Sequence, residues 1–79
     1  MKKYVVNKDL ILGSIFKQGF TVKDFCLNKL GCSRVNFYAA LNRIYVKPRS
    51  QFMTKVINET GLPENLIWEE MEWVKNYRY

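Results

Sequence analysis

The stretch that decides the fold is TVKDFCLNKLGCSRVNFYAALNR, residues 21–43. Thr21 and Asp24 form a capping pair, because the hydroxyl can accept from the first helical turn and the carboxylate lies near the positive helix end. Apolar residues then recur at helical spacing as far as Gly31, which provides the left-handed conformation that ends a helix. Ser33 caps a second helix. The stretch predicts two short helices. Because the turn between them is short, the two helices are expected to cross instead of lying antiparallel.

The second of these helices has a core side and a free side. Its core side carries Phe37, Ala40 and Leu41. The positions on its other sides are free to contact another molecule, and they are Arg34, Val35, Tyr38, Ala39 and Asn42.

Five short motifs occur in a fixed order: GCSR at 31–34, FY at 37–38, LN at 41–42, KP at 47–48 and GLPE at 61–64. Over residues 8–70 the chain resembles the Cro and phage-repressor helix-turn-helix family. The resemblance implies an all-α, five-helix, lambda-repressor-like DNA-binding domain with its helix-turn-helix at about residues 21–42. It also implies a small transcriptional regulator, a Cro-like or prophage-type repressor, that binds double-stranded DNA sequence-specifically.

Two positions depart from the family pattern. The family has a small residue, mostly Ala, four positions before the turn glycine, whereas this chain has Leu27 there and the small Cys26 one position earlier. Either the first helix carries one extra residue, or Leu27 occupies the place where Ala lets the helices approach. Arg43 stands where the family often has the glycine that closes the reading helix.

The resemblance implies that residues just after the turn, and one helical turn later, contact base edges. Residue-by-residue matching gives Arg34, Val35 and Ala39. Arg34 can make a forked contact to guanine, and the two apolar side chains can pack on thymine methyls. The complete predicted base-reading set is Arg34, Val35, Asn36, Tyr38 and Ala39.

Phosphate contacts are predicted from the helix start at Thr21 and from the segment after the reading helix. The predicted set is Thr21, Lys23, Ser33, Asn42, Arg43, Tyr45, Lys47 and Arg49. Residues 1–50 hold ten Lys and Arg against two Asp, a net +8, whereas residues 51–79 hold three basic against five acidic residues, a net −2. This segregation suits a polyanion on one side of the molecule.

The remaining helices are predicted from caps and periodicity. Residues 1–6 form either an arm or an extended lead-in, and Asn7 caps a helix to about residue 18 with Leu10, Ile11, Ile15 and Phe16 facing inward. Residues 44–49 are strand-like but are expected to form a surface loop, because no partner strand is predicted. Ser50 caps a helix to Thr60 that buries Phe52, Val56 and Ile57. Phe25, Cys32, Phe37 and Leu41 complete the predicted core.

Residues 63–79 are predicted to form a final helix and tail, with Pro63 in its first turn and a stripe of Leu66, Ile67, Met71 and Val74. Trp68 and Trp73 are five residues apart and cannot both share this stripe. These aromatic residues either close the core or form a contact between copies. We expect a homodimer, weak in solution and complete on DNA, through Trp68, Met71, Trp73 and Tyr77.

Several functions are not expected. The chain of 79 residues makes one domain, 1–79, and it has no histidine, no nucleophile beside a base and no glycine-rich phosphate loop. Cys26 and Cys32 are not a CxxC pair and are expected to be small buried hydrophobes in a reducing compartment. We therefore expect no enzyme activity, metal, cofactor or small-molecule substrate.

The expected location is the bacterial cytosol or nucleoid, because no run approaches the ~18 apolar residues of a membrane span and no signal sequence is evident. The alternative function is a protein-interaction adaptor or anti-repressor that uses the same helical fold and binds through its aromatic carboxyl-terminal helix.

Overall fold

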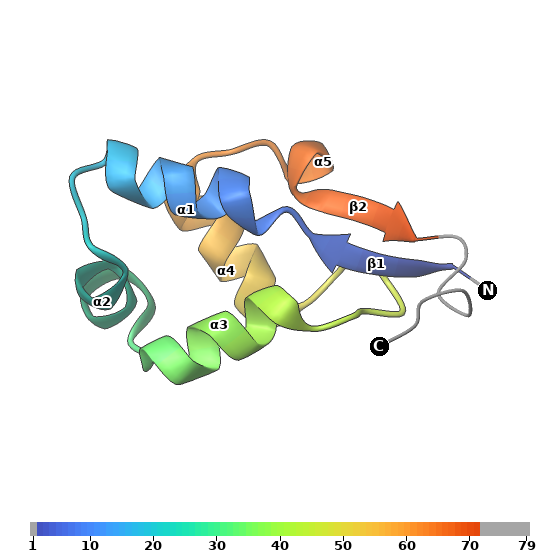
Figure 1. Ribbon diagram of the computed structural model, residues 1–79, viewed down its shortest axis with the longest axis horizontal. Coiled ribbons are helices and arrows are strands. Elements are labelled where there is room, and N and C mark those ends of the chain that lie inside the picture. The colour runs from blue at the N-terminus through green and yellow to red at the C-terminus, as the bar shows by residue number, and fades with distance from the viewer. Residues whose placement is uncertain (1, 72–79) are drawn as a thin grey trace.

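The computed structural model describes residues 2–71 of the chain. The elements in order are β1 (Lys3–Val6), α1 (Lys8–Lys17), α2 (Val22–Phe25), the π-helical turn η1 (Cys26–Leu30), α3 (Arg34–Asn42), α4 (Gln51–Thr60), α5 (Glu64–Ile67) and β2 (Trp68–Met71). α2 runs directly into η1, so these residues contain five helices. Figure 1 shows α4 between α1 and α3, with the two strands at the opposite end of the molecule from α2.

The predicted starts of four helices and the predicted glycine stops at Gly31 and Gly61 are confirmed. Asn7, Thr21, Ser33 and Ser50 are the N-caps, and each side-chain oxygen accepts from the backbone N–H three residues later. The donors are the amides of Leu10, Asp24, Asn36 and Met53, at 3.3, 3.1, 3.2 and 3.3 Å. η1 and α4 end at left-handed glycines, Gly31 with φ 65° and Gly61 with φ 74°.

The turn η1 accommodates one extra residue before Gly31. The N–H groups of Gly31 and Cys32 both donate to the carbonyl of Cys26, five and six residues back, instead of the usual four. Cys26 is 1% exposed, whereas Leu27 is 60% exposed. Of the two alternatives for this departure, the structure therefore shows the extra residue, and Leu27 does not lie between the helices.

The expectation of an all-α, five-helix fold is confirmed only in part. The described residues are mostly helical and form five helices, but they also form a small two-stranded sheet. β1 pairs antiparallel with β2, with Lys3 opposite Met71 and Val6 opposite Trp68. On its other side β1 is bridged to Tyr45, and the backbone groups of Tyr4 and Tyr45 exchange two N–H···O bonds of 2.8 Å. The strands come from the two ends of the described chain, and local periodicity gives no signal for such a pairing.

Of the arm and the extended lead-in expected at residues 1–6, the structure shows an extended segment, β1. Two other predictions about individual segments are corrected. The segment at 44–49 has a partner at one residue, Tyr45. The final helix ends at Ile67, after which residues 68–71 are extended. Ile67 is buried, but Leu66 is 51% exposed, and Val74 lies outside the described residues.

The core lies between the helices and the inner face of the sheet. Predicted core residues Ile11, Ile15, Phe25, Phe37, Leu41, Val56 and Ile57 are buried, and Cys32 and Phe52 are half-buried against them. Leu10 and Phe16 were predicted to face inward but are 38% and 61% exposed. Within residues 2–71, no helix combines the length and the apolar character that a membrane crossing requires.

Candidate nucleic-acid interface

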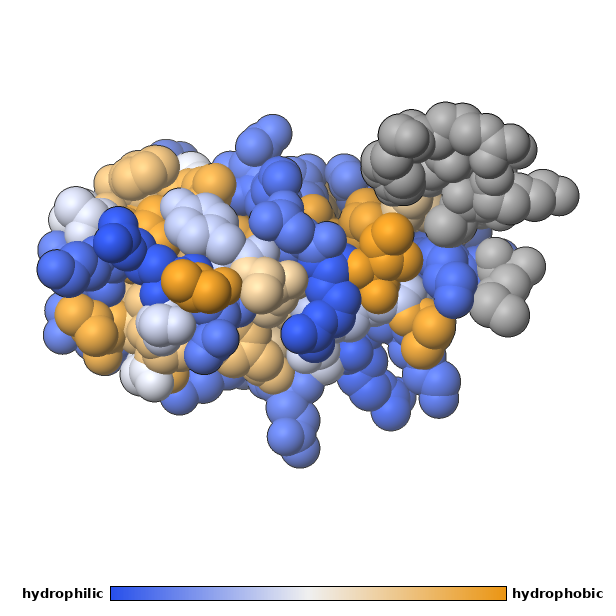
Figure 2. Space-filling view, turned by 60° about the horizontal axis from the view of Figure 1, so that its bottom comes forward, coloured by the Kyte–Doolittle hydropathy of each residue, from blue (hydrophilic) through white to orange (hydrophobic). Residues whose placement is uncertain are grey.

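The outer face of α3 carries all five predicted base-reading residues. Arg34, Val35, Asn36, Tyr38 and Ala39 are exposed, and Val35 is the most open of the large apolar side chains at 78%. Figure 2 looks toward the α3 side of the molecule and shows single apolar side chains scattered among hydrophilic ones. An exposed arginine beside small apolar side chains can make both hydrogen bonds and apolar contacts to base edges.

The inner face of α3 holds the helix firmly. Phe37, Ala40 and Leu41 are buried, and the Phe37 ring packs against Phe25 at a centroid distance of 6.4 Å. At the other end of α3, the Tyr45 hydroxyl donates to the carbonyl of Ala40 at 2.8 Å. The helix is therefore fixed at both ends while its outer face stays free.

Exposed polar and basic groups lie on α2, at the end of α3 and in the segment that follows α3. The exposed members of the predicted phosphate-contact set include Lys23, Asn42, Arg43, Lys47 and Arg49. Thr21 and Ser33 are also exposed, with hydroxyl oxygens that accept from the amides of Asp24 and Asn36. These two hydroxyl groups therefore serve as the N-caps of α2 and α3.

Tyr45 is placed differently from its prediction. It is 8% exposed, its hydroxyl is bonded to α3, and Arg43 lies over its ring at 5.8 Å. Burial raises the pKa of Tyr45, although the nearby Arg43 charge and Ser50 hydroxyl act in the opposite direction. Tyr45 therefore supports α3 and Arg43 from within, and we remove it from the phosphate-contact set.

Lys8 is a residue that the sequence analysis missed. It stands in the first turn of α1, and its Nζ donates to the side-chain oxygen of Asn42 at 2.7 Å. Lys8 and Asn42 are 34 residues apart. They meet because β1, which ends just before Lys8, contacts α3. Lys8 therefore adds an exposed positive charge at the end of α3.

A cavity of about 300 Å³ lies beside α3, at the start of α4. It is lined by Cys32, Asn36, Ala39, Ala40, Arg43, Tyr45, Ser50 and Phe52. The same cavity is therefore lined by two predicted base-reading residues, Asn36 and Ala39, by Arg43 and by Ser50, the N-cap of α4. In this position a DNA phosphate could approach both the Arg43 side chain and the N-terminus of α4.

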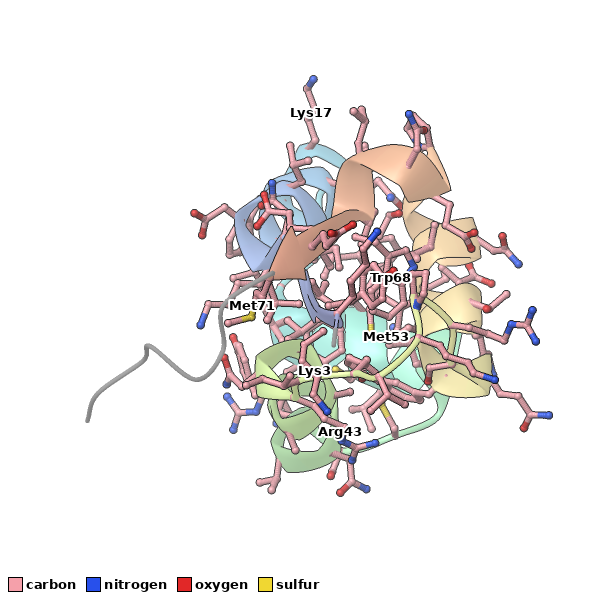
Figure 3. The ribbon with its side chains drawn as sticks, turned by 90° about the vertical axis from the view of Figure 1, so that its right-hand side faces the viewer. Lys3, Lys17, Arg43, Met53, Trp68 and Met71 are labelled. Carbon is pink, nitrogen blue, oxygen red and sulfur yellow. The ribbon has the colours of Figure 1, made fainter. Side chains whose placement is uncertain are left out.

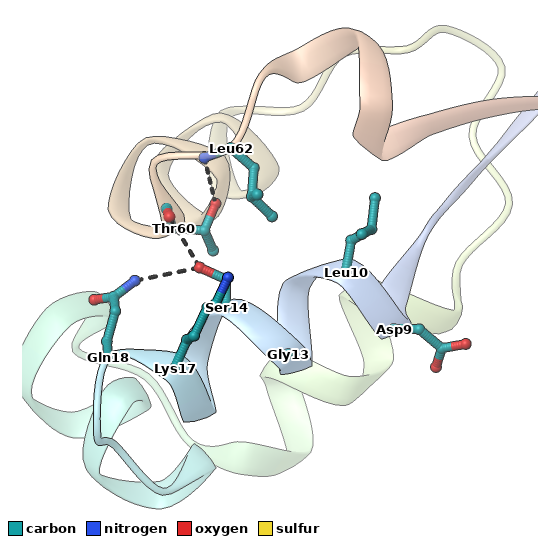
Figure 4. A pocket seen from close by; sticks show the side chains of 8 residues that line it. All are labelled: Asp9, Leu10, Gly13, Ser14, Lys17, Gln18, Thr60 and Leu62. Atoms are coloured by element: carbon teal, nitrogen blue, oxygen red, sulfur yellow. Dashed lines mark hydrogen bonds between the residues drawn. The ribbon is translucent and has the colours of Figure 1, made fainter.

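A second cavity, of about 670 Å³, involves no residue of α3. Figure 4 shows its lining of Asp9, Leu10, Gly13, Ser14, Lys17, Gln18, Thr60 and Leu62. The Ser14 hydroxyl donates to the Thr60 carbonyl at 2.9 Å, and Gln18 Nε2 lies 3.4 Å from Ser14 Oγ. These polar groups join α1 to the end of α4, so we assign them a structural role.

The predicted dimer residues divide into two groups. Trp68 packs edge-on against Tyr45 at a centroid distance of 5.1 Å, and Figure 3 shows Trp68 and Met53 in the middle of the molecule. Met71 is half-buried and pairs with Lys3 in the sheet. Trp73 and Tyr77 lie outside the described residues. Trp68 therefore closes the monomer core, which was one of the two alternatives for the aromatic residues.

No family model, no curated protein and no solved structure matches the chain.

Proposed function

We propose that this protein binds double-stranded DNA sequence-specifically and acts as a small transcriptional regulator, a Cro-like or prophage-type repressor. The observation that supports this most is the division of α3 into a buried side and an exposed side. The exposed side offers Arg34 with Val35 and Ala39, which suit guanine and thymine edges in a major groove.

The surrounding basic residues support the same proposal. Lys8, Lys23, Arg43, Lys47 and Arg49 are exposed around the helix-turn-helix. In this arrangement they would neutralise the phosphates on both sides of the groove that α3 enters. Such a ligand would place the protein in the bacterial cytosol or nucleoid.

The test is selection of binding sites from random duplex DNA, followed by measurement of affinity as a function of salt. We expect a defined consensus and a log K that falls by roughly 0.9 per phosphate contact for each unit of log salt. Lack of retention on heparin, together with no gel shift on any selected pool, would contradict DNA binding.

The alternative of a protein-interaction adaptor has some support of its own. Phe16 and Leu27 are 61% and 60% exposed and belong to neither the core nor the exposed face of α3. An adaptor would associate with a partner protein in a manner insensitive to salt, and it would give no shift with DNA. The same salt series therefore discriminates between the two functions.

We further propose that two copies assemble on DNA, because a single module buries little surface and paired modules read two half-sites about one helical turn apart. With Trp68 in the monomer core, Trp73 and Tyr77 are the aromatic candidates that stay in this contact. Sedimentation equilibrium of the native protein and of Trp73→Ala, free and with DNA, tests it. A native protein that stays monomeric on its operator contradicts the pairing.

A further inference from the structure

The two cysteines, Cys26 and Cys32, meet across the turn of the helix-turn-helix. The Cys32 N–H donates to the Cys26 carbonyl at 3.1 Å, which with standard bond lengths keeps the two Cα atoms within about 7 Å. Disulfides form between residues whose Cα atoms are at most about 7 Å apart. The π-turn η1 is responsible, because it turns Cys26 toward the core and brings the chain back beside it at Cys32.

The two thiols are neighbours but have different access to solvent. Cys26 is 1% exposed, and burial together with the adjacent Cys32 thiol raises the pKa of Cys26 to about 11. Cys32 is half-buried and forms part of the wall of the 300 Å³ cavity beside α3. A small neutral oxidant can therefore reach Cys32 from the cavity, whereas Cys26 is closed to solvent.

We propose that Cys26 and Cys32 form a dithiol site that a peroxide converts into an intramolecular disulfide, with Cys32 as the attacking thiol and Cys26 as the resolving thiol. This use of the cysteines goes beyond their expected role as buried hydrophobes.

The chemistry balances with one peroxide per protein. The Cys32 thiolate attacks a peroxide oxygen, the O–O bond breaks, and hydroxide leaves and is protonated to water, which gives a sulfenic acid on Cys32. The Cys26 sulfur then attacks the Cys32 sulfur, so that the S–S bond forms and the S–O bond breaks. The second water leaves with the Cys26 proton, and the two electrons from the thiols are gained by the peroxide.

The disulfide would act on the reading helix, and this consequence rests on the proposed function. Thiols in contact must approach to about 2.05 Å when they bond, so the turn has to tighten. Ser33 and Arg34 follow Cys32 directly, so the cap of α3 and its first base-reading residue would move with the turn. We expect the oxidised protein to bind its preferred site at least about tenfold more weakly, because base contacts need accurate geometry.

The experiment uses the full chain, hydrogen peroxide as the probe and maleimide to trap free thiols. We expect an intact mass lower by two hydrogen atoms, no uptake of maleimide and full recovery with dithiothreitol. Cys32→Ser and Cys26→Ala should each abolish this product, while circular dichroism verifies that both variants are folded. Intermolecular disulfides only, or higher sulfur oxides without the lighter species, would overturn the proposal.

Affinity for the selected DNA site is measured on the same samples. Weaker binding after peroxide that dithiothreitol restores, and that is absent in Cys32→Ser, supports the effect on α3. Unchanged affinity of the disulfide form overturns that effect. Failure of the reduced protein to bind DNA contradicts the proposed function instead, because the mass and maleimide measurements do not depend on DNA.

Discussion

Lys8 Nζ donates to Asn42 Oδ1 at 2.7 Å and thereby joins the first turn of α1 to the last turn of α3. Both side chains are exposed, so the bond contributes little to folding, and most of its effect should be on the interface. It holds the Asn42 amide in one orientation beside a positive charge. A phosphate that approaches this end of α3 would therefore meet a preformed pair.

The first prediction concerns this pair. Lys8→Met and Asn42→Ala should each weaken DNA binding, and the double variant should lose less than the sum, with a coupling of about 0.5–1 kcal/mol. Fluorescence anisotropy on the selected site measures the four affinities. Additive losses would show that the two residues contact DNA independently. The free energy of unfolding should change by no more than about 0.5 kcal/mol in either single variant.

The second prediction concerns affinity without sequence preference. Lys47→Ala or Arg49→Ala should weaken binding similarly on all DNA sequences and reduce the salt slope by roughly one unit per lost phosphate contact. Lys17→Ala is the control of equal charge, because Lys17 is exposed at the end of α1 and is not one of the predicted phosphate contacts. In Figure 3 it projects from the side of the molecule opposite to Arg43. Slopes that stay at the native value in both test variants would remove these residues from the phosphate contacts.

The third prediction concerns specificity. Arg34→Ala should cost about 1–3 kcal/mol on the preferred site and relax the preference at one base pair, because a forked contact to guanine is lost. Val35 and Ala39 should govern neighbouring base pairs. Repeating the site selection with the Arg34 variant measures this. If the consensus and the affinity are both unaltered, another element reads the bases.

The fourth prediction concerns Tyr45 and alkaline pH. Because the folded state raises the pKa of Tyr45 above its ordinary value of 10.0, folding favours the protonated hydroxyl. The stability that it contributes is fully present below pH 10 and is lost as the pH rises through the higher folded pKa. Urea unfolding at several pH values above 9 measures this decline, which should be smaller in Tyr45→Phe.

The Tyr45→Phe variant has a second expected effect at neutral pH. It leaves the Ala40 carbonyl without the 2.8 Å hydrogen bond, which should cost about 1–2 kcal/mol of stability. Tyr38→Phe is the matched control, because Tyr38 is exposed at 38% on α3. An equal loss of stability in both variants would mean that the buried Tyr45 hydrogen bond stabilises the fold no more than the exposed Tyr38 hydroxyl does.

The fifth prediction concerns Trp68. Trp68→Ala should destabilise the monomer by about 2–4 kcal/mol, because the indole packs on Tyr45 and partly on the core. Urea unfolding at a protein concentration where the chain is monomeric measures the loss. A variant with native monomer stability but reduced self-association would return Trp68 to the dimer contact.

The sequence alone was sufficient to predict the capped starts of four helices and two of their glycine ends. Thr21, Ser33 and Ser50 cap helices through a bond to a backbone amide three residues away, and Gly31 and Gly61 end them in the left-handed region. These interactions lie within a few residues of one another, so local chemistry determines them. The alternation of buried and exposed positions on α3 follows from helical periodicity in the same way.

Contacts between distant parts of the chain decided the rest. The pairing of β1 with β2, the burial of Tyr45 and the Lys8–Asn42 bond each join segments that are far apart in the sequence. The π-turn that buries Cys26 and exposes Leu27 depended on how η1 packs against the core. Residues 68–71 include Glu69, Glu70 and Met71, which favour a helix by themselves. They form a strand because β1 offers unpaired backbone groups beside them.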